Sequence, residues 1–383
     1  MGLLQAYFIT YTAVVFLHVW YKYTMKYIKK EKKYGEYPAR FSVVIPSYNE
    51  KPSALKRCIR SVITANGDKE VFVVDDGSKP EIKKAIRKFK LDFNFIDLKK
   101  NVGKRRAQYE AFKLARNELI VTIDSDTIIR KNSLVEIAKP FNDDRIVAVT
   151  GNAKVINRKQ NLLTRIIDAR YTNAFEFERA SQSSLGVVNC CTGVLSAYRK
   201  SFIDRVKEDY VSQTFLGKEC TYGDDRRLTA LALMNNFKVV FAKRALAYTK
   251  APTRLKELIN QQKRWKKSFI RESLLAFGYV FGLKNKWIAF DNIFDSFMPL
   301  FSLIVRISVI YTIVVYPISI FYYIAIIAVM AVVRNAESLI KGRWDNLFYN
   351  MIYGYLQMMV MYWLYYSALW ELFVKRDVSW GTR

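Results

Sequence analysis

The chain has 383 residues, 51% of them hydrophobic and 15% aromatic, so extensive disorder is excluded and roughly two or three structural units are expected. The 62 Lys and Arg residues outnumber the 34 Asp and Glu residues, and the net charge of +28 favours phosphorylated or polyanionic partners. With one histidine, His18, and no C-x-x-C pair among four cysteines, a His-ligated zinc site is not expected and a His-based catalytic triad is excluded. A general base is therefore to be sought first among the carboxylates.

The N-terminus begins with an uncharged apolar stretch, Leu3 to Trp20, which is long enough to cross a bilayer core of about 30 Å. A signal peptide is the alternative, but no basic segment precedes the stretch and no small-residue cleavage site follows it. The lysine-rich segment that follows is expected in the cytoplasm, where positive charge beside membrane helices accumulates. We predict a transmembrane helix over 1–21 and a basic juxtamembrane linker over 22–40.

Short apolar runs rich in β-branched residues alternate with helical patterns between residues 41 and 249. The expected strands are 41–47, 71–74, 93–96 and 119–123, and the expected helices are 52–64, a stretch after residue 78, and 103–115. Such alternation is typical of a doubly wound α/β domain, whose ligands bind at the carboxyl ends of the strands.

Acidic clusters follow two of these predicted strands. Asp75 and Asp76 follow the second strand, and Asp124 and Asp126 follow the fourth. A single aspartate at such a position is often only a turn former or a helix N-cap. Two clusters on one sheet of a strongly basic protein favour a functional site instead. The D-x-D spacing suits Mg²⁺ or Mn²⁺, since Mg²⁺ typically takes one or two carboxylates together with substrate phosphates.

Two further segments carry groups for phosphate and proton chemistry. Gly103 and Lys104 open a predicted helix whose N-terminus could hold a phosphate, although a solvated basic helix start is the alternative. Asp224 and Asp225 form a carboxylate pair, and burial of such a pair raises at least one pKa, which suits a general base. An ion pair with a neighbouring arginine is the alternative for this pair.

Residues 250–287 are predicted to form amphipathic helices at the membrane interface. Helical spacing places four of their side chains on one face, namely Gln261, Arg264, Trp265 and Ser268. An arginine on that face can clamp a diphosphate, and a tryptophan can stack on a sugar ring. The same helix can lie on a membrane surface through its apolar side, and both uses are compatible.

The apolar region over 288–333 is long enough for two crossings, and we predict a transmembrane hairpin there. If 347–370 also crossed, the basic tail would lie outside, against the usual charge distribution. We therefore predict an interfacial or re-entrant segment over 334–374 and a cytoplasmic tail over 375–383.

Seven short segments together resemble the processive family 2 glycosyltransferases, and the closest similarity is to the hyaluronan synthases. They are PSYNE (46–50), VDDGS (74–78), NVGKRR (101–106), DSD (124–126), YGDDRR (222–227), QQKRW (261–265) and WGTR (380–383). The resemblance covers residues 41–383 and implies a GT-A type doubly wound mixed sheet in the cytoplasm, with transmembrane and interfacial helices. GDDR and the terminal WGTR favour hyaluronan over chitin-oligosaccharide synthesis.

The resemblance also implies which residues bind the donor nucleotide sugar. They are Tyr48, Asp75, Asp76, Lys104, Arg105, Asp124, Gln261 and Arg264, together with a gating loop that contains Trp380, Thr382 and Arg383. A metal ion, Mg²⁺ or Mn²⁺, would be held by Asp126 and Asp124.

For the transfer itself, the resemblance implies that Asp225 is the general base, flanked by Asp224 and Arg226. The acceptor sugar would lie on Trp265. A priming segment near the acceptor would comprise Cys191, Thr192 and Gly193. Val194 follows this segment where the family usually has proline.

The expected partners are UDP-GlcNAc, UDP-GlcA, the growing polysaccharide and the lipid bilayer, with no nucleic acid. Because few membrane segments are predicted, a channel built by a homo-oligomer stays open. Two other functions also stay open at this point. One is a chitin-type synthase that uses UDP-GlcNAc alone, and the other is a non-catalytic, membrane-anchored binder of anionic polymers.

Overall fold

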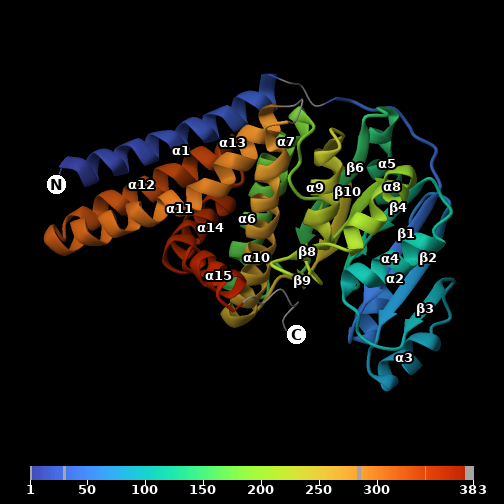
Figure 1. Ribbon diagram of the computed structural model, residues 1–383. Helices are drawn as coiled ribbons and strands as arrows, with labels where there is room; N and C mark the ends of the chain where they lie inside the picture. The colour runs from blue at the N-terminus through green and yellow to red at the C-terminus, as the bar shows by residue number, and fades with distance from the viewer. Residues whose placement is uncertain (1, 29–31, 283–285, 341, 376–383) are drawn as a thin grey trace.

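The computed structural model describes residues 2–28, 32–282, 286–340 and 342–375. Its centre is a mixed eight-stranded sheet with the strand order β3-β2-β1-β4-β7-β6-β10-β5, flanked by helices (Figure 1). The strands are β1 (Phe41–Ser47), β2 (Lys69–Asp76), β3 (Asn94–Leu98), β4 (Leu119–Thr122), β5 (Ile128–Ile129), β6 (Ile146–Val155), β7 (Ser196–Arg199) and β10 (Lys238–Thr249). A small separate ribbon pairs β8 (Thr214–Phe215) with β9 (Lys218–Glu219).

The first half of the sheet is parallel, and the strand–helix alternation predicted for this region is confirmed. β1 pairs in parallel with β2 and β4, and β2 pairs in parallel with β3. The connecting helices are α2 (Pro52–Ile63), α3 (Pro80–Arg87) and α4 (Lys104–Leu114). α2 forms where proline favours the first turn, and its buried Leu55, Ile59 and Val62 recur at helical spacing against the sheet. This half therefore brings the ends of β2 and β4 to one edge.

The second half is mixed because β7 runs antiparallel between β4 and β6. β6 pairs in parallel with β10, and β5 lies antiparallel on the far side of β10. The segment that leads into β7 crosses the carboxyl end of β4, where the Asp124 amide donates a hydrogen bond of 2.9 Å to the Gly193 carbonyl. This crossing places the predicted priming segment directly beside the D-x-D loop.

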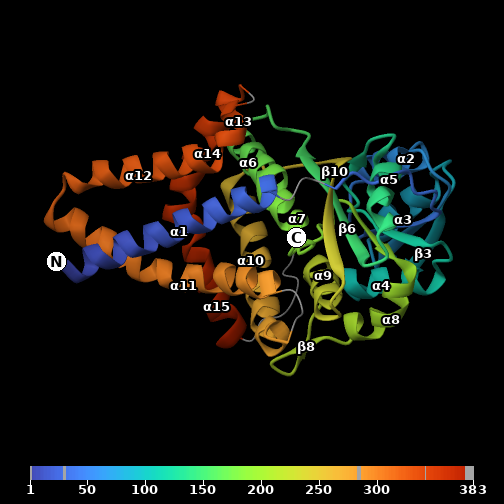
Figure 2. The same cartoon turned by 90° about the horizontal axis from the view of Figure 1, so that it is seen from above.

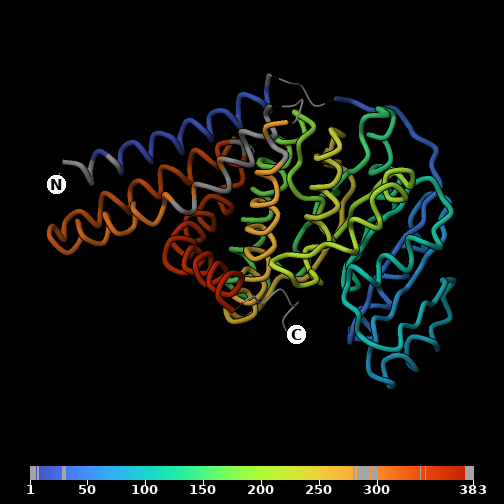
Figure 3. The backbone as a smooth tube through the Cα atoms, viewed as in Figure 1, coloured from blue at the N-terminus to red at the C-terminus, as the bar shows by residue number. Residues whose placement is uncertain are grey.

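Helices complete the layer around the sheet and carry the chain towards the C-terminus. They are α5 (Ser133–Ala138), η1 (Lys139–Asn142), α6 (Leu162–Asn173), the π-helical η2 (Ala174–Arg179), α7 (Ala180–Leu185), α8 (Lys200–Val211) and α9 (Asp224–Met234). The long α10 (Leu255–Val280) stands between this α/β unit and the remaining helices, as the chain trace shows (Figures 2 and 3).

Three helices extend together away from the sheet, α1 (Gly2–Ile28), α11 (Lys286–Val315) and α12 (Ser319–Arg334) (Figures 1 and 2). The hairpin expected over 288–333 thus corresponds to α11 and α12. In the part of the chain that the structure describes, no helix combines the length and the apolar content needed to span a bilayer. Membrane crossing over 1–21 and 288–333 stays a prediction.

The predicted interfacial segment, 334–374, is also helical. It consists of α13 (Ala336–Ile340), α14 (Trp344–Leu356), the π-helical η3 (Gln357–Met361) and α15 (Trp363–Phe373). α14 packs on α6, and α15 packs on α10, where Tyr365, Ala368 and Leu372 are buried beside Ile270. Its relation to a membrane stays a prediction.

Candidate active site

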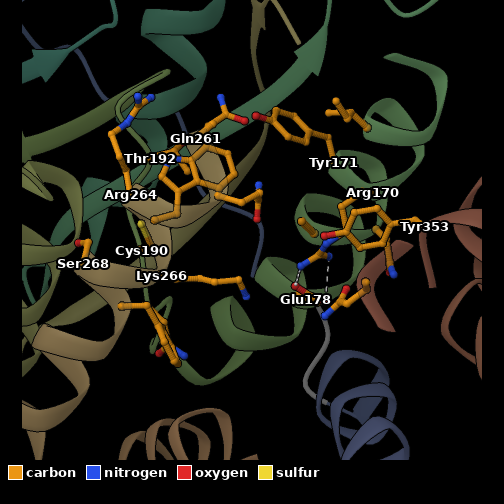
Figure 4. Close-up of a pocket in the computed structure, with 18 of the residues that line it drawn as sticks. Arg170, Tyr171, Glu178, Cys190, Thr192, Gln261, Arg264, Lys266, Ser268 and Tyr353 are labelled. Carbon is orange, nitrogen blue, oxygen red and sulfur yellow. Dashed lines mark hydrogen bonds and ion pairs between the residues drawn. The ribbon is translucent and has the colours of Figure 1, made fainter. Parts of the chain in front are cut away.

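A cavity of about 1290 Å³ joins the carboxyl edge of the sheet to the surrounding helices. Its sheet end is lined by Tyr48, Asp76, Lys104, Asp124 and Asp126, and its helical end by side chains of α1, α6, α10, α11, α12 and α14. Figure 4 shows Arg264, Ser268 and Lys266 on one side of the helical part, and Arg170, Glu178 and Tyr353 on the other.

The aspartates that follow β2 have different surroundings. Asp76 lines the cavity and accepts hydrogen bonds from the amides of Val102 (2.7 Å) and Gly103 (3.0 Å), which holds the segment before α4. Burial raises the pKa of Asp76. Asp75 is fully buried behind it, where it accepts from the Ser78 amide at 3.0 Å, and it does not line the cavity. Asp75 therefore supports the turn, and Asp76 reaches the cavity.

Lys104 connects two of the predicted clusters. Its Nζ atom lies 2.7 Å from Oδ1 of Asp124 and 2.8 Å from Oδ2 of Asp224. Burial alone would lower the pKa of Lys104, but these two carboxylates raise the pKa well above its usual value. A Cβ atom on Gly193 would lie 2.8 Å from this Nζ and 2.9 Å from Asp124 Oδ1. A side chain at position 193 would therefore displace Lys104 or Asp124 from this ion pair.

The D-x-D loop offers two carboxylates to the cavity, from Asp124 and Asp126. The Ser125 hydroxyl between them donates to Glu50 Oε2 at 3.1 Å and fixes the loop. Among the described residues, no group of three or more metal-binding side chains is found. Two half-exposed carboxylates fit a Mg²⁺ or Mn²⁺ ion that takes its other ligands from a nucleotide diphosphate and water.

Asp224 and Asp225 begin α9 after Gly223, which has φ +73°. A side chain on Gly223 would lie 2.2 Å from Ser268 Oγ, so glycine lets α10 approach. Burial would raise the pKa of Asp224, but Lys104 outweighs it and lowers the pKa. Burial, and then the Asp224 charge, raise the pKa of Asp225. The pKa values of the two neighbouring carboxyl groups are therefore shifted in opposite directions, down for Asp224 and up for Asp225.

Asp225 is held from two sides. Its Oδ1 accepts from the Arg226 amide at 2.8 Å, and its Oδ2 lies 3.5 Å from Cys190 Sγ. Both Asp225 and Cys190 line the cavity, and the Arg226 guanidinium lies 5.1 Å from the ring centroid of Phe269 in α10. This carboxylate is placed to accept a proton from a hydroxyl in the cavity.

The predicted face of α10 is turned to the cavity. Its four side chains, Gln261, Arg264, Trp265 and Ser268, all line the space, and Trp265 is 43% exposed. On another face, Lys263 and Lys267 form ion pairs with Glu371 of α15, the second at 3.3 Å. The side chains of α10 that line the cavity and those that bind α15 therefore lie on different faces of the helix.

Besides Asp75, two predicted site residues lie away from the cavity. Arg105 was expected to bind the donor, but it is 1% exposed and does not line the cavity, because it donates to Gln213 Oε1 at 2.6 Å and to the Gly223 carbonyl at 2.9 Å. Cys191 is also buried, and its amide donates to Thr229 Oγ1 at 2.9 Å.

In the priming segment, Thr192 and Gly193 line the cavity together with the preceding Cys190, whereas the Cys191 side chain lies in the hydrophobic core. The gating-loop residues Trp380, Thr382 and Arg383 lie outside the described residues.

Several charged cavity residues were not among the predicted site residues. Arg170 of α6 and Glu178 of η2 form a bidentate salt bridge, in which the arginine donates hydrogen bonds of 3.1 and 3.3 Å to the two carboxylate oxygens. Lys266 and Arg306 also line the cavity, from α10 and α11. A π-helical turn and contacts between distant helices bring these groups together, and no local spacing reveals either.

Comparison with known proteins agrees with this geometry. The family model described as "Glycosyl transferase family 2" matches residues 42–207. A hyaluronan synthase of Streptococcus pyogenes serotype M3 is 35% identical and covers 97% of this chain and 90% of its own length. An N-acetylglucosaminyltransferase of Mesorhizobium japonicum is 36% identical over 70% of this chain and 64% of its own length.

Among solved structures, a mannosyltransferase from Pyrobaculum calidifontis, in complex with GDP-Man and Mn²⁺, has a TM-score of 0.65. The superposition covers 93% of this chain and 99% of the mannosyltransferase chain, at 18% sequence identity, and supports the GT-A type fold. The relatives and the family model identify the chain as a glycosyltransferase, which contradicts the alternative of a non-catalytic polymer binder. The chain belongs to the hyaluronan synthase family within the family 2 glycosyltransferases.

Proposed function

We propose that this protein polymerises hyaluronan from UDP-GlcNAc and UDP-GlcA by successive inverting transfers. The observation that carries the proposal is the Asp224–Asp225 pair beside a cavity that continues from the D-x-D loop into the helices. Lys104 keeps Asp224 ionised, whereas burial and the Asp224 charge raise the pKa of Asp225. A carboxylate with a raised pKa beside an acceptor path has the properties of a general base.

In the proposed step, Asp225 accepts the proton of an acceptor hydroxyl while that oxygen attacks the anomeric carbon of the donor sugar. The bond from this carbon to the diphosphate breaks, UDP leaves, and the configuration at the carbon is inverted. Lys104 and Arg264 bind the diphosphate, and Trp265 supports the acceptor ring, since all three line the cavity. Asp124 and Asp126 would hold the metal ion, whose charge stabilises the leaving diphosphate.

The helical part of the cavity supports extension of a chain rather than a single transfer. Its lining includes Phe8 and Tyr11 of α1 and Phe294 and Met298 of α11. A path of this kind can hold several sugars of the growing polymer. Coupling of synthesis to secretion through these helices is part of the proposal.

The test is a radiolabel assay on the purified full chain with each UDP-sugar alone and with both together. Polymer that requires both donors and is degraded by hyaluronidase supports the proposal. The similarity to an N-acetylglucosaminyltransferase over 70% of the chain makes a chitin-type synthase the second candidate. Polymer formed from UDP-GlcNAc alone and degraded by chitinase would establish that candidate instead.

A further inference from the structure

Two cations in the helical part of the cavity, Lys266 and Arg306, have no carboxylate partner among the described residues. Lys266 extends from α10 into this space (Figure 4). The structure gives it no ion pair or hydrogen bond within the described residues, and the charged groups that act on it are the cations Arg306 and Arg170. Burial, followed by these two cations, lowers the pKa of Lys266 to about 8. The charged form of Lys266 is therefore destabilised by burial and by these cations, and no anion from the described residues offsets this cost.

Arg306 of α11 is in a similar position. It is 5% exposed, its Nη2 donates to Ser302 Oγ at 2.9 Å, and its guanidinium lies 3.8 Å from the ring centroid of Tyr362. Its Nη1 is buried and has no hydrogen-bond partner among the described residues. A buried donor without an acceptor is unfavourable, so a ligand oxygen at this point would be stabilised.

Among the described residues, two carboxylates of the helical region, Glu178 and Glu371, are already paired with other cations. Glu178 accepts both of its hydrogen bonds from Arg170, and Glu371 pairs with Lys263 and Lys267. The acidic lining residues Asp76, Asp124, Asp126, Asp224 and Asp225 belong to the sheet end of the cavity. The cavity is therefore acidic where the metal and the diphosphate are expected, and cationic farther along.

We propose that Lys266 and Arg306 form an anion subsite that binds the carboxylate of a uronate residue in the acceptor saccharide. The inference rests on the proposed function, because it takes the occupant of the cavity to be the growing polymer. A saccharide is favoured because the same cavity contains Asp225 and the half-exposed Trp265, which neighbours Lys266 on α10. The subsite would distinguish a uronate-containing chain from a neutral chain of N-acetylglucosamine.

The test compares binding of a hyaluronan tetrasaccharide and of chitotetraose to the purified full chain. Lys266→Met should weaken binding of the hyaluronan tetrasaccharide about tenfold or more, as expected for a hydrogen bond to a charged group, and leave chitotetraose binding unchanged. Lys266→Arg should restore most of the affinity, which shows that the charge and not the fold was lost. Lys263→Met is the matched control, because it removes the same charge from α10 outside the cavity and should change neither affinity.

Equal weakening for both oligosaccharides, or no change for either, would overturn the subsite. UDP affinity and binding to phosphatidylglycerol vesicles are measured on the same variants. A loss confined to UDP would assign Lys266 to the diphosphate, and a loss confined to vesicles would assign it to a lipid headgroup; either result rejects the proposal. The polymerisation assay is independent of these measurements, so polymer made from UDP-GlcNAc alone would refute the proposed donor pair even if Lys266 binds uronate.

Discussion

The ammonium nitrogen of Lys104 lies 2.8 Å from Oδ2 of Asp224 and so joins the Asp224–Asp225 pair to the D-x-D loop, where it also contacts Asp124 at 2.7 Å. One side chain thus links the proposed diphosphate end of the site to the proposed proton-transfer end. The charge of Lys104 lowers the pKa of Asp224 and also opposes the rise in the pKa of Asp225. Substitution of Lys104 should therefore change the pH dependence of the transfer reaction.

Asp225→Asn should abolish transfer and keep donor binding. The amide has the shape of the carboxylate but does not accept a proton, and loss of a general base typically lowers kcat by about 10²–10⁴. Turnover and UDP-GlcNAc affinity are measured on the same preparation. A parallel fall of both would make Asp225 an ion-pair residue rather than the base.

The pH dependence of kcat/KM should have an acidic limb that reports Asp225. The base must be ionised, so activity falls as pH drops through its pKa, which burial and Asp224 raise above the ordinary 3.8. Lys104→Met removes a cation that lowers this pKa, and the acidic limb should move to higher pH. Lys113→Met, whose ammonium pairs with Glu110 on the outer part of α4, is the control and should leave the limb in place. An unmoved limb in Lys104→Met would separate Lys104 from proton transfer.

Removal of divalent cations should stop synthesis. EDTA should abolish polymer formation, and added Mg²⁺ or Mn²⁺ should restore it. Asp126→Asn removes one expected ligand charge and should raise the metal concentration needed for half-maximal activity. Asp204→Asn, at a surface ion pair with Lys200 and Lys207, should not change this requirement. Full activity in excess EDTA would contradict the metal site.

Gly193→Ala should lower kcat with little effect on stability. The new Cβ would lie 2.8 Å from Lys104 Nζ, the mobile end of a side chain that can move, and 2.9 Å from Asp124 Oδ1. A displacement of about 1 Å at reacting groups can cost about 10²-fold in rate. Gly278→Ala, on α10 with open space around the new methyl group, is the control. Equal effects of both substitutions on the thermal midpoint and on kcat would reject the close approach at Gly193.

Local sequence patterns determined much of the α/β unit. The elements from β1 to β4, with α2 and α4 between them, follow from short β-branched runs and helical spacing of apolar residues. The acidic positions at the strand ends and the cavity face of α10 follow from the same periodicities, because strands and helices turn their side chains at fixed intervals. These features depend on neighbours in the chain, and the sequence alone predicts them.

Tertiary structure decided which of these groups meet. Lys104 bridges Asp124 and Asp224, and the adjacent Arg105 instead supports the Gly223 turn, because α4 turns consecutive side chains in different directions. Cys190 lines the cavity, whereas the adjacent Cys191 packs into the hydrophobic core. Lys266 has no ion-pair partner in the part of the chain that the structure describes, and the cations that act on it, Arg170 and Arg306, come from the distant helices α6 and α11. Contacts of this kind are long-range, and local periodicity carries no information about them.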